Sequence, residues 1–192
     1  MPALAELPSE NPSNSWERQL ISEVLRKDRK ATAEFVTQCV DWVYPYVRRR
    51  LVPRTEIVED IMQEILFAAW QSLSNFRGDT GLRAWVLGIA RHKVEDYYRK
   101  RLREAEVPQE DGAESEDSVA PLVEEQLDAA AQQERVERTL ARLPENYALA
   151  LIWRYRDDKS ATEMASLIGK TEKAVERLLS RARENFRKRW NR

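Results

Sequence analysis

Residues 82–103 read LRAWVLGIARHKVEDYYRKRLR, and the rest of the chain is organised around this stretch. Its apolar residues recur at intervals of three and four, which predicts one helix with a buried stripe. The stripe consists of Leu82, Trp85, Val86, Ile89, Val94 and Tyr97. The hydroxyl of Thr80 is expected to cap this helix, and Asp79 places negative charge at the positive end of its dipole.

The other face of the same helix is strongly basic. It carries Arg83, Arg91, Lys93, Arg99, Lys100, Arg101 and Arg103, against only Glu95 and Asp96. A packed helix with a surplus of cations on its outer side is typical of a site for a polyanion. The alternative is an ordinary solvated basic face. A second basic helix near the end of the sequence favours the polyanion.

The composition predicts an all-α protein with uneven charge. Its 192 residues are enough for one or two domains with hydrophobic cores. Only five residues are glycine, and no stretch has the alternating pattern of a strand. The net charge of −1 conceals segregation, because residues 104–128 contain ten acids and no Lys or Arg, whereas residues 170–192 contain nine Lys or Arg and three Glu.

The acidic stretch divides the chain into two small helical domains. Residues 104–122 combine acids with Pro and Gly and cannot bury enough apolar surface to fold alone, which predicts a flexible acidic linker. The first domain is expected over residues 15–103 and the second over residues 123–192. Residues 1–14 hold three prolines among polar residues and are predicted to be a flexible tail.

Two helices are expected at the start of the first domain. The first begins at a capping Ser15 and buries Trp16, Leu20, Ile21, Val24 and Leu25. The second buries Phe35, Val36, Cys39, Val40 and Val43. Pro45 is expected to end or kink the second helix, because it has no N–H to donate and its ring clashes with the preceding turn.

A third helix is predicted over residues 55–74, with two different faces. Its inner stripe consists of Ile57, Ile61, Ile65, Leu66, Ala69 and Leu73. Its other side carries Asp60, Gln63, Glu64, Phe67 and Trp70. An acidic and aromatic outer face indicates a protein partner rather than DNA. The alternative is that the two aromatic side chains complete the core.

Residues 75–81, NFRGDTG, are predicted to form a loop. Gly78 and Gly81 permit backbone angles that other residues avoid. Phe76 and Arg77 are unusual in a loop, and an exposed aromatic ring beside a cation is a common means of holding single-stranded bases by stacking. The alternative is that Phe76 folds back onto the helices beneath it.

The second domain is predicted to end in a helix-turn-helix. Helices over residues 123–142 and 145–155 come first, the former burying Leu127, Ala130, Val136 and Leu140. Ser160 and Glu163 then form a capping box for a short helix, Gly169 supplies the turn, and Thr171 caps a longer helix. In this motif the start of the second helix meets base edges. Its inward residues are Val175, Leu178, Leu179 and Ala182.

Few residues offer catalytic or metal chemistry. Cys39 is the only cysteine and His92 the only histidine, so a disulfide framework, a metal cluster and a Ser-His arrangement are not expected. We predict no catalytic residue, no metal site and no cofactor. No apolar run approaches the roughly 20 residues of a membrane span, and the first residues lack the features of a secretory signal. The expected location is the cytoplasm, without membrane insertion.

These segments together resemble the bacterial RNA polymerase sigma factors of the extracytoplasmic-function (ECF) group. The sequence DIMQEI at residues 60–65 resembles the region 2 signature of that family. FRG at 76–78 and AWVLGIARH at 84–92 resemble a later part of region 2. Leu143-Pro144, EMA at 163–165 and SRAR at 180–183 resemble region 4. The resemblance covers nearly the whole chain after the tail, with its parts in the right order.

The resemblance implies a region 2 bundle and a region 4 helix-turn-helix domain, with core RNA polymerase and promoter DNA as partners. The polymerase contacts would be the β′ clamp helices and the β flap, with Asp60, Gln63, Glu64, Phe67 and Trp70 on the clamp helices. The residues implied for the minus-ten element and its opened strand are Asn75, Phe76, Arg77, Gly78, Asp79, Arg91, Lys93, Asp96, Arg99 and Lys100. Those implied for the minus-thirty-five element are Lys170, Thr171, Glu172, Lys173, Glu176, Arg177 and Arg181.

Two other functions remain open at the level of sequence. A free-standing helix-turn-helix regulator would bind a defined duplex without polymerase. A sigma-like decoy would bind an anti-sigma protein and no DNA, although basic faces on both domains speak against it. An anti-sigma protein is also a possible partner of an active sigma factor. An enzyme has little support, because the many acids pair with no His, Cys cluster or Gly-rich phosphate loop.

Overall fold

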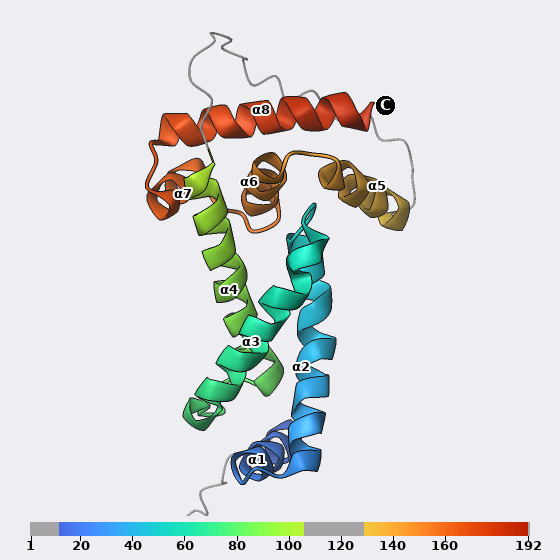
Figure 1. The fold of residues 1–192 in the computed structure, drawn as a ribbon, viewed down its shortest axis with the longest axis vertical. Helices are drawn as coiled ribbons and strands as arrows, with labels where there is room; N and C mark the ends of the chain where they lie inside the picture. Colours follow the sequence, from blue (N-terminus) through green and yellow to red (C-terminus); the bar gives the residue numbers. More distant parts are fainter. Residues whose placement is uncertain (1–11, 106–128, 192) are drawn as a thin grey trace, which may run out of the picture. The chain divides into compact units, whose positions relative to one another are not determined.

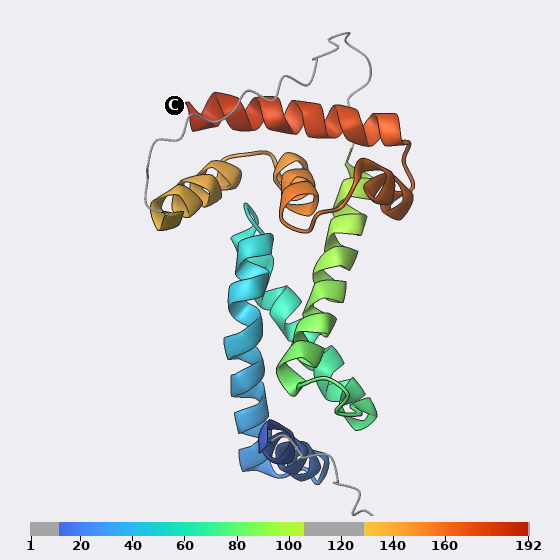
Figure 2. The same ribbon diagram turned by 180° about the vertical axis from the view of Figure 1, so that it is seen from behind.

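The computed structural model describes residues 12–105 and 129–191, and every regular element in these two ranges is helical (Figure 1; Figure 2). The helices are α1 Pro12–Leu25, α2 Arg29–Arg50, α3 Val58–Ser72, α4 Leu82–Glu104, α5 Ala129–Ala141, α6 Glu145–Tyr155, α7 Ala161–Ile168 and α8 Glu172–Trp190. Short 3-10 helices, Thr55–Ile57 and Leu73–Asn75, flank α3. The prediction of an all-α fold is therefore confirmed.

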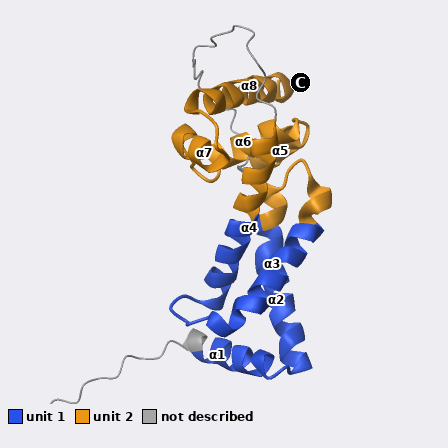
Figure 3. Cartoon of the chain, turned by 60° about the vertical axis from the view of Figure 1, so that its left-hand side comes forward, with its two compact units in different colours: residues 1–46, 59–93 blue, residues 47–58, 94–192 orange. Residues whose placement is uncertain are grey.

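The chain divides into two compact units (Figure 3). Unit 1 comprises residues 1–46 and 59–93, and unit 2 comprises residues 47–58 and 94–192. The helices α2 and α4 each begin in unit 1 and end in unit 2. The predicted tail lies outside the described residues up to residue 11, and so does the predicted linker after its first two residues.

Unit 1 has a core formed by α1, α2, α3 and the first part of α4. On α2 the side chains of Phe35, Cys39 and Val43 are almost completely buried, at intervals of four residues. On α3 the side chains of Ile65 and Ala69 are fully buried, as predicted. Apolar surface removed from water in this way stabilises the fold by about 25 cal/mol per Å².

The first helix is longer than predicted and buries fewer of its apolar residues. It begins at Pro12, three residues before the predicted cap Ser15. The residues buried as predicted are Leu20, Ile21 and Val24. Trp16 and Leu25, however, are 40% and 51% exposed. The prediction that α1 buries these two side chains is therefore wrong.

Pro45 lies inside α2, which continues for five residues beyond it to Arg50. The prediction offered two effects of Pro45, an end or a kink. The first is wrong, because the helix does not end at Pro45. Pro45 is exposed, so water can reach the carbonyl of Asp41 that loses its helical partner, while Val43 and Val47 remain fully buried on the inner face. Packing on that face keeps the segment helical.

The buried stripe of α4 differs from the predicted one in both halves of the helix. The buried residues follow one another at intervals of four, namely Leu82, Val86, Ala90, Val94, Tyr98 and Leu102. The predicted stripe also includes residues that are only half-buried, namely Trp85, Ile89 and Tyr97. Tyr98 takes the inner position because its ring packs edge-on against Trp153, with centroids 5.8 Å apart, and its hydroxyl donates to the carbonyl of Arg50 at 2.7 Å.

In unit 2 the long helix α8 packs across α5, α6 and α7 (Figure 1; Figure 2). The helix α6 has the bounds that the sequence predicts and is the most buried, with every residue from Ala148 to Trp153 inside the core. On α5, Leu140 is buried as predicted, but Ala130 is exposed and not inward. The predicted first turns of this helix, from residue 123, lie outside the described residues.

Candidate nucleic-acid and polymerase interfaces

The outer face of α3 is exposed, acidic and aromatic. Asp60, Gln63 and Glu64 are all exposed on it. Phe67 and Trp70 are 63% and 42% exposed, so the alternative that they complete the core is wrong. Phe67 and Trp70, three residues apart, thus expose apolar surface beside these polar neighbours.

An ion pair joins this face to α4. The Nζ atom of Lys93 lies 3.2 Å from Oε2 of Glu64. Both side chains are partly exposed, so the pair contributes about 0.2–1 kcal/mol to stability. Glu64 belongs to the residues predicted to bind polymerase, and Lys93 belongs to those predicted to bind DNA. The two predicted sets are therefore in contact through this ion pair.

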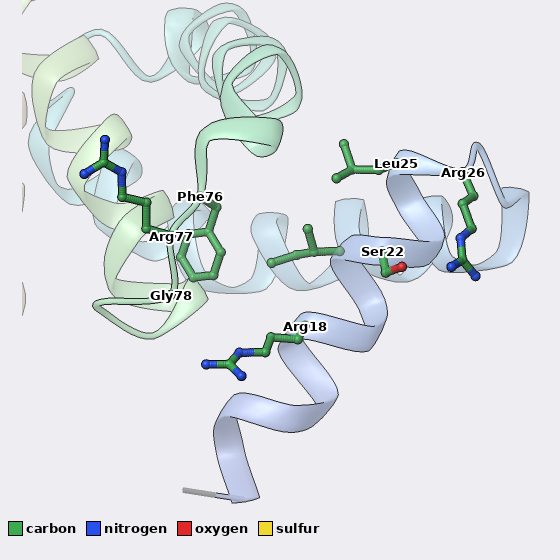
Figure 4. Close-up of a pocket in the computed structure, with 8 residues that line it drawn as sticks. Arg18, Ser22, Leu25, Arg26, Phe76, Arg77 and Gly78 are labelled. Carbon is green, nitrogen blue, oxygen red and sulfur yellow. The ribbon is translucent and has the colours of Figure 1, made fainter. Parts of the chain in front are cut away.

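The loop between α3 and α4 lines a surface pocket of about 390 Å³ (Figure 4). The ring of Phe76 is half-buried and packs edge-on against Trp85, with centroids 5.3 Å apart. Phe76 therefore leans on α4 and still faces the pocket. Among the other predicted loop residues, Asn75, Arg77 and Asp79 are exposed, and Gly78 is half-buried.

The opposite wall of this pocket comes from α1, which the sequence analysis did not assign to the site. The α1 side supplies Arg18, Ile21, Ser22, Leu25 and Arg26, facing Phe76, Arg77 and Gly78. Figure 4 shows Arg18 extending toward the loop. Guanidinium groups around an aromatic ring match the two parts of a single-stranded nucleotide, its phosphate and its base. The exposed cations on α1 were the signal that could have identified this wall.

A residue of α1 also holds the start of α4. The first helical residue is Leu82, so Gly81 occupies the position before the helix and the predicted cap Thr80 lies one residue too early. The N–H of Leu82 donates to a carboxylate oxygen of Glu17 at 3.1 Å. Glu17 is only 8% exposed. The hydrogen bond from Leu82 to Glu17 therefore fixes the start of α4, where the loop ends, against α1.

The outer face of α4 continues as a basic surface. Arg91, Asp96 and Lys100 are exposed, and Arg99 is half-buried and hydrogen-bonds to Asp96. A shallow pocket of about 420 Å³ lies over the last turns of the helix. Its lining residues are Asp96, Arg99, Lys100, Arg103 and Glu104. Three of the predicted DNA-contacting residues, Asp96, Arg99 and Lys100, thus line one pocket on α4.

The predicted helix-turn-helix is confirmed in each of its local signals. The Ser160 hydroxyl accepts from the N–H of Glu163 at 3.2 Å, and the Ser160 N–H donates to the Glu163 carboxylate at 2.8 Å, which completes the capping box. The hydrogen bonds that the Ser160 N–H and the Ser160 hydroxyl donate to the Glu163 carboxylate lower the pKa of Glu163. Gly169 has a φ of 68°, a left-handed conformation that glycine adopts without steric cost. The Thr171 hydroxyl accepts from the N–H of Ala174 at 3.2 Å.

The helix α8 buries the residues that the sequence predicts and leaves its first turns accessible. Its buried side chains are Val175, Leu178, Leu179 and Ala182. Thr171, Glu172, Lys173 and Glu176 are exposed, while Lys170, Arg177 and Arg181 are half-buried. Glu172 accepts a hydrogen bond of 2.7 Å from the hydroxyl of Thr162 on α7. Glu172 therefore also ties the two helices of the motif together.

Family models match both parts of the chain. The Sigma-70 region 2 family matches residues 35–104, and the Sigma-70 region 4 family matches residues 133–186. The ECF RNA polymerase sigma factor ShbA of Streptomyces griseus is 31% identical over 178 residues, which span 85% of this chain and 92% of that protein. This chain belongs to the RNA polymerase sigma factors of the ECF group.

Other relatives of this ECF sigma factor agree. The ECF RNA polymerase sigma-E factor of Escherichia coli K12 is 30% identical over 172 residues, covering 86% of this chain and 89% of that protein. A solved structure of CnrH in complex with the cytosolic domain of CnrY is 25% identical, covers 90% of this chain and 95% of that chain, and has a TM-score of 0.41. The two family models and the ShbA and sigma-E relatives show that the protein binds core RNA polymerase and directs promoter-specific transcription initiation.

Within residues 12–105 and 129–191, no three His, Cys, Asp or Glu side chains are grouped closely enough to hold a metal ion. In the same ranges, no helix combines the length and apolar character that crossing a membrane requires.

Proposed function

We propose that the first turns of α8 bind the minus-thirty-five element in the major groove. The supporting observation is the motif itself, in which both helix starts are capped and all the predicted inward side chains of α8 are buried. That packing leaves Lys173, Glu176 and Arg177 on the side away from the core. Glu176 suits the amino group of cytosine, and Arg177 suits guanine or a phosphate.

The loop of residues 75–79 and the basic face of α4 are proposed to bind the minus-ten element. The pocket between the loop and α1 is large enough for one flipped base against Phe76, with Arg18 and Arg77 near its phosphates. The remaining assigned residues are Arg91, Lys93, Asp96, Arg99 and Lys100. They continue along one face of α4, so they suit the backbone of the adjoining DNA.

The exposed face of α3 is proposed as the surface for the β′ clamp helices. Phe67 and Trp70 supply accessible apolar area, and Asp60, Gln63 and Glu64 supply a polar rim, which is the usual anatomy of a protein interface. The β flap is assigned to the second domain, residues 123–192. We place the complex in the cytoplasm. An anti-sigma protein that covers the α3 face would compete with polymerase for Phe67 and Trp70.

The test is run-off transcription on genomic fragments with core polymerase, with and without this protein. Arg177→Ala combined with Arg181→Ala should abolish recognition of the upstream element and leave core binding intact. The matched control is Arg138→Ala, because that side chain is exposed on α5 and paired with Glu134 in the adjacent turn. Loss of core binding in the double variant would contradict the assignment of α8 to DNA.

A further inference from the structure

Within unit 2 the carboxylate of Glu145 is surrounded by three donors. Glu145 is the first residue of α6, and its side chain is 15% exposed. The Arg101 guanidinium donates to both oxygens, with distances of 2.5 and 3.2 Å. Nη1 of Arg54 lies 3.4 Å from Oε2, and the Tyr97 hydroxyl donates to Oε1. Arg54, Tyr97 and Arg101 thus form a binding site for an oxyanion.

The electrostatics of this cluster favour a negative charge. Burial alone would raise the pKa of Glu145, but hydrogen bonds from Arg101 and Tyr97 and the charges of Arg101 and Arg54 outweigh it and lower that pKa. The pKa of Tyr97 is raised, first by burial and then by its hydrogen bond to the Glu145 carboxylate. Glu145 is therefore ionised and Tyr97 remains a donor at neutral pH.

Other contacts in unit 2 join the end of α2 and the second half of α4 to residues that follow α6 and α7. Arg50 pairs with Asp157 at 2.6 Å, and Lys159 pairs with Glu95 at 3.0 Å. The Nζ atom of Lys170, directly before the capped start of α8, donates to the carbonyl of Ala105 at the end of α4. The start of the recognition helix thus lies within one lysine side chain of the end of the helix that carries Arg99 and Lys100.

This arrangement cannot be kept on a promoter. The minus-ten and minus-thirty-five elements are centred about 25 base pairs apart, on the order of 85 Å at 3.4 Å per base pair. A lysine side chain spans only a few ångströms. If α4 and α8 bind one element each, as proposed above, the contact of Lys170 with Ala105 must break. The carboxylate of Glu145 must then leave Arg54, Tyr97 and Arg101.

We propose that Arg54, Tyr97 and Arg101 form a phosphate site for the promoter backbone, which Glu145 occupies while unit 2 is closed. This rests on the proposed function of α4 and α8. A planar carboxylate and a tetrahedral phosphate each present two oxygens to a guanidinium, which binds either group through two parallel N–H bonds. Arg101 follows Lys100 in the chain, and Lys100 is assigned to the minus-ten DNA. Glu145 therefore competes with DNA inside the free chain.

Neighbouring acids do not replace Glu145. Arg54 also pairs with Glu56, and Arg101 lies 3.6 Å from Glu104. The side chains of Glu56 and Glu104 are 60% and 52% exposed, so solvent screens these pairs. A phosphate that binds the two guanidinium groups and the hydroxyl therefore has to displace only weak ion pairs with Glu56 and Glu104.

The first experiment measures the binding of the free full-length chain to a fluorescein-labelled short DNA duplex of arbitrary sequence, by fluorescence anisotropy over a series of salt concentrations. Phosphate contacts carry no sequence information, so the target promoter is not needed. Glu145→Gln should bind about tenfold more tightly than the unaltered chain, with a salt dependence steeper by about one to two released counterions. Adding Arg54→Ala and Arg101→Ala should remove the whole gain.

Glu134→Gln removes a carboxylate from an exposed pair on α5 and should bind like the unaltered chain. Equal binding by Glu145→Gln and the unaltered chain would overturn the proposal. So would a gain that survives the loss of both arginines, because Glu145 would then be covering another surface. Circular dichroism establishes that each variant is folded.

The second experiment uses the holoenzyme, in which polymerase has already separated α4 from α8. Glu145→Gln should there bind promoter DNA within about twofold of the unaltered protein, whereas Arg54→Ala with Arg101→Ala should bind about tenfold more weakly. Unchanged DNA affinity of the double variant overturns the phosphate site. Weakened binding to core instead would mean that the site holds an acid of polymerase. Run-off transcription by the unaltered protein tests the proposed function separately.

Discussion

The carboxylate of Glu17 accepts a hydrogen bond of 3.1 Å from the N–H of Leu82, although 65 positions separate the two residues. Leu82 begins α4, and the first N–H groups of a helix have no partner within it. A Cβ atom at Gly81 would lie 3.6 Å from the second carboxylate oxygen of Glu17, an ordinary van der Waals contact, so this approach does not depend on glycine. The cap of α4 therefore comes from another helix.

Glu17→Ala should lower the free energy of unfolding by about 1–2 kcal/mol, because it leaves the Leu82 N–H buried without an acceptor. Glu17→Gln should lose less, since its amide oxygen can still accept. Urea denaturation measures both. Glu23→Ala is the matched control on the same helix, where the carboxylate accepts from the exposed side chain of Gln19. Equal losses for Glu17→Ala and Glu23→Ala would show that the cap has no effect.

Alanine should have opposite effects at two glycines. At Gly169 the φ of 68° is left-handed, so alanine should lower the free energy of unfolding by about 1 kcal/mol through backbone strain. At Gly88, inside α4, alanine should raise it by about 0.5–1 kcal/mol through helix propensity. A Cβ atom meets nothing within 4 Å at either position, so sterics do not confuse the comparison. Thermal and urea unfolding would give the two signs, and a gain at Gly169 would contradict the assigned backbone conformation.

The thiol of Cys39 should be unreactive in the folded protein. The side chain is fully buried, and burial raises its pKa to about 12 from an ordinary value near 9. An aromatic disulfide reagent at neutral pH should therefore titrate one thiol in denaturant and essentially none without it. Because the folded pKa is the higher one, the contribution of Cys39 to stability is complete below pH 9 and is lost as the pH rises toward 12. Fast modification of the native protein would contradict this burial.

Local signals explain which parts of the fold could be predicted. The bounds of α6, α7 and α8 follow from Pro144, Gly169 and the caps Ser160 and Thr171, which act within one turn of their own helices. The start of α4 could also be predicted, but its cap could not, because Glu17 is distant in sequence. Local residues were less reliable in the first domain, where α1 begins three residues before Ser15 and α2 continues past Pro45.

Which apolar side chains face inward depended on partners that the sequence does not reveal. Tyr97 and Tyr98 are equally suited to a stripe, and the contact with Trp153 makes Tyr98 the buried one. In the same way, the two aromatic residues on the outer face of α3 could not be assigned to core or surface from spacing alone. The exposure of Phe67 and Trp70 resolved that choice.

Phe67→Ala and Trp70→Ala should weaken the binding of core polymerase more than they destabilise the protein. Phe67 is 63% exposed in the free chain, so its removal should change the free energy of unfolding by less than about 0.5 kcal/mol, whereas Trp70 is 42% exposed and its removal should lower that free energy by about 1 kcal/mol. At an interface, aromatic anchors often contribute more than 2 kcal/mol each, equivalent to a loss of about thirtyfold or more in affinity. Competition binding against a labelled sigma factor on core polymerase measures the loss.

Tyr44→Ala is the matched control for this prediction. Tyr44 lies on α2 and is 43% exposed, against 42% for Trp70, so the two substitutions remove similar amounts of accessible aromatic surface. If general hydrophobicity drove the association, Tyr44→Ala and Trp70→Ala would weaken it equally. If the α3 face is the docking surface, only the α3 variants lose affinity, and their run-off transcription is restored by raising the concentration of the variant until the polymerase is saturated.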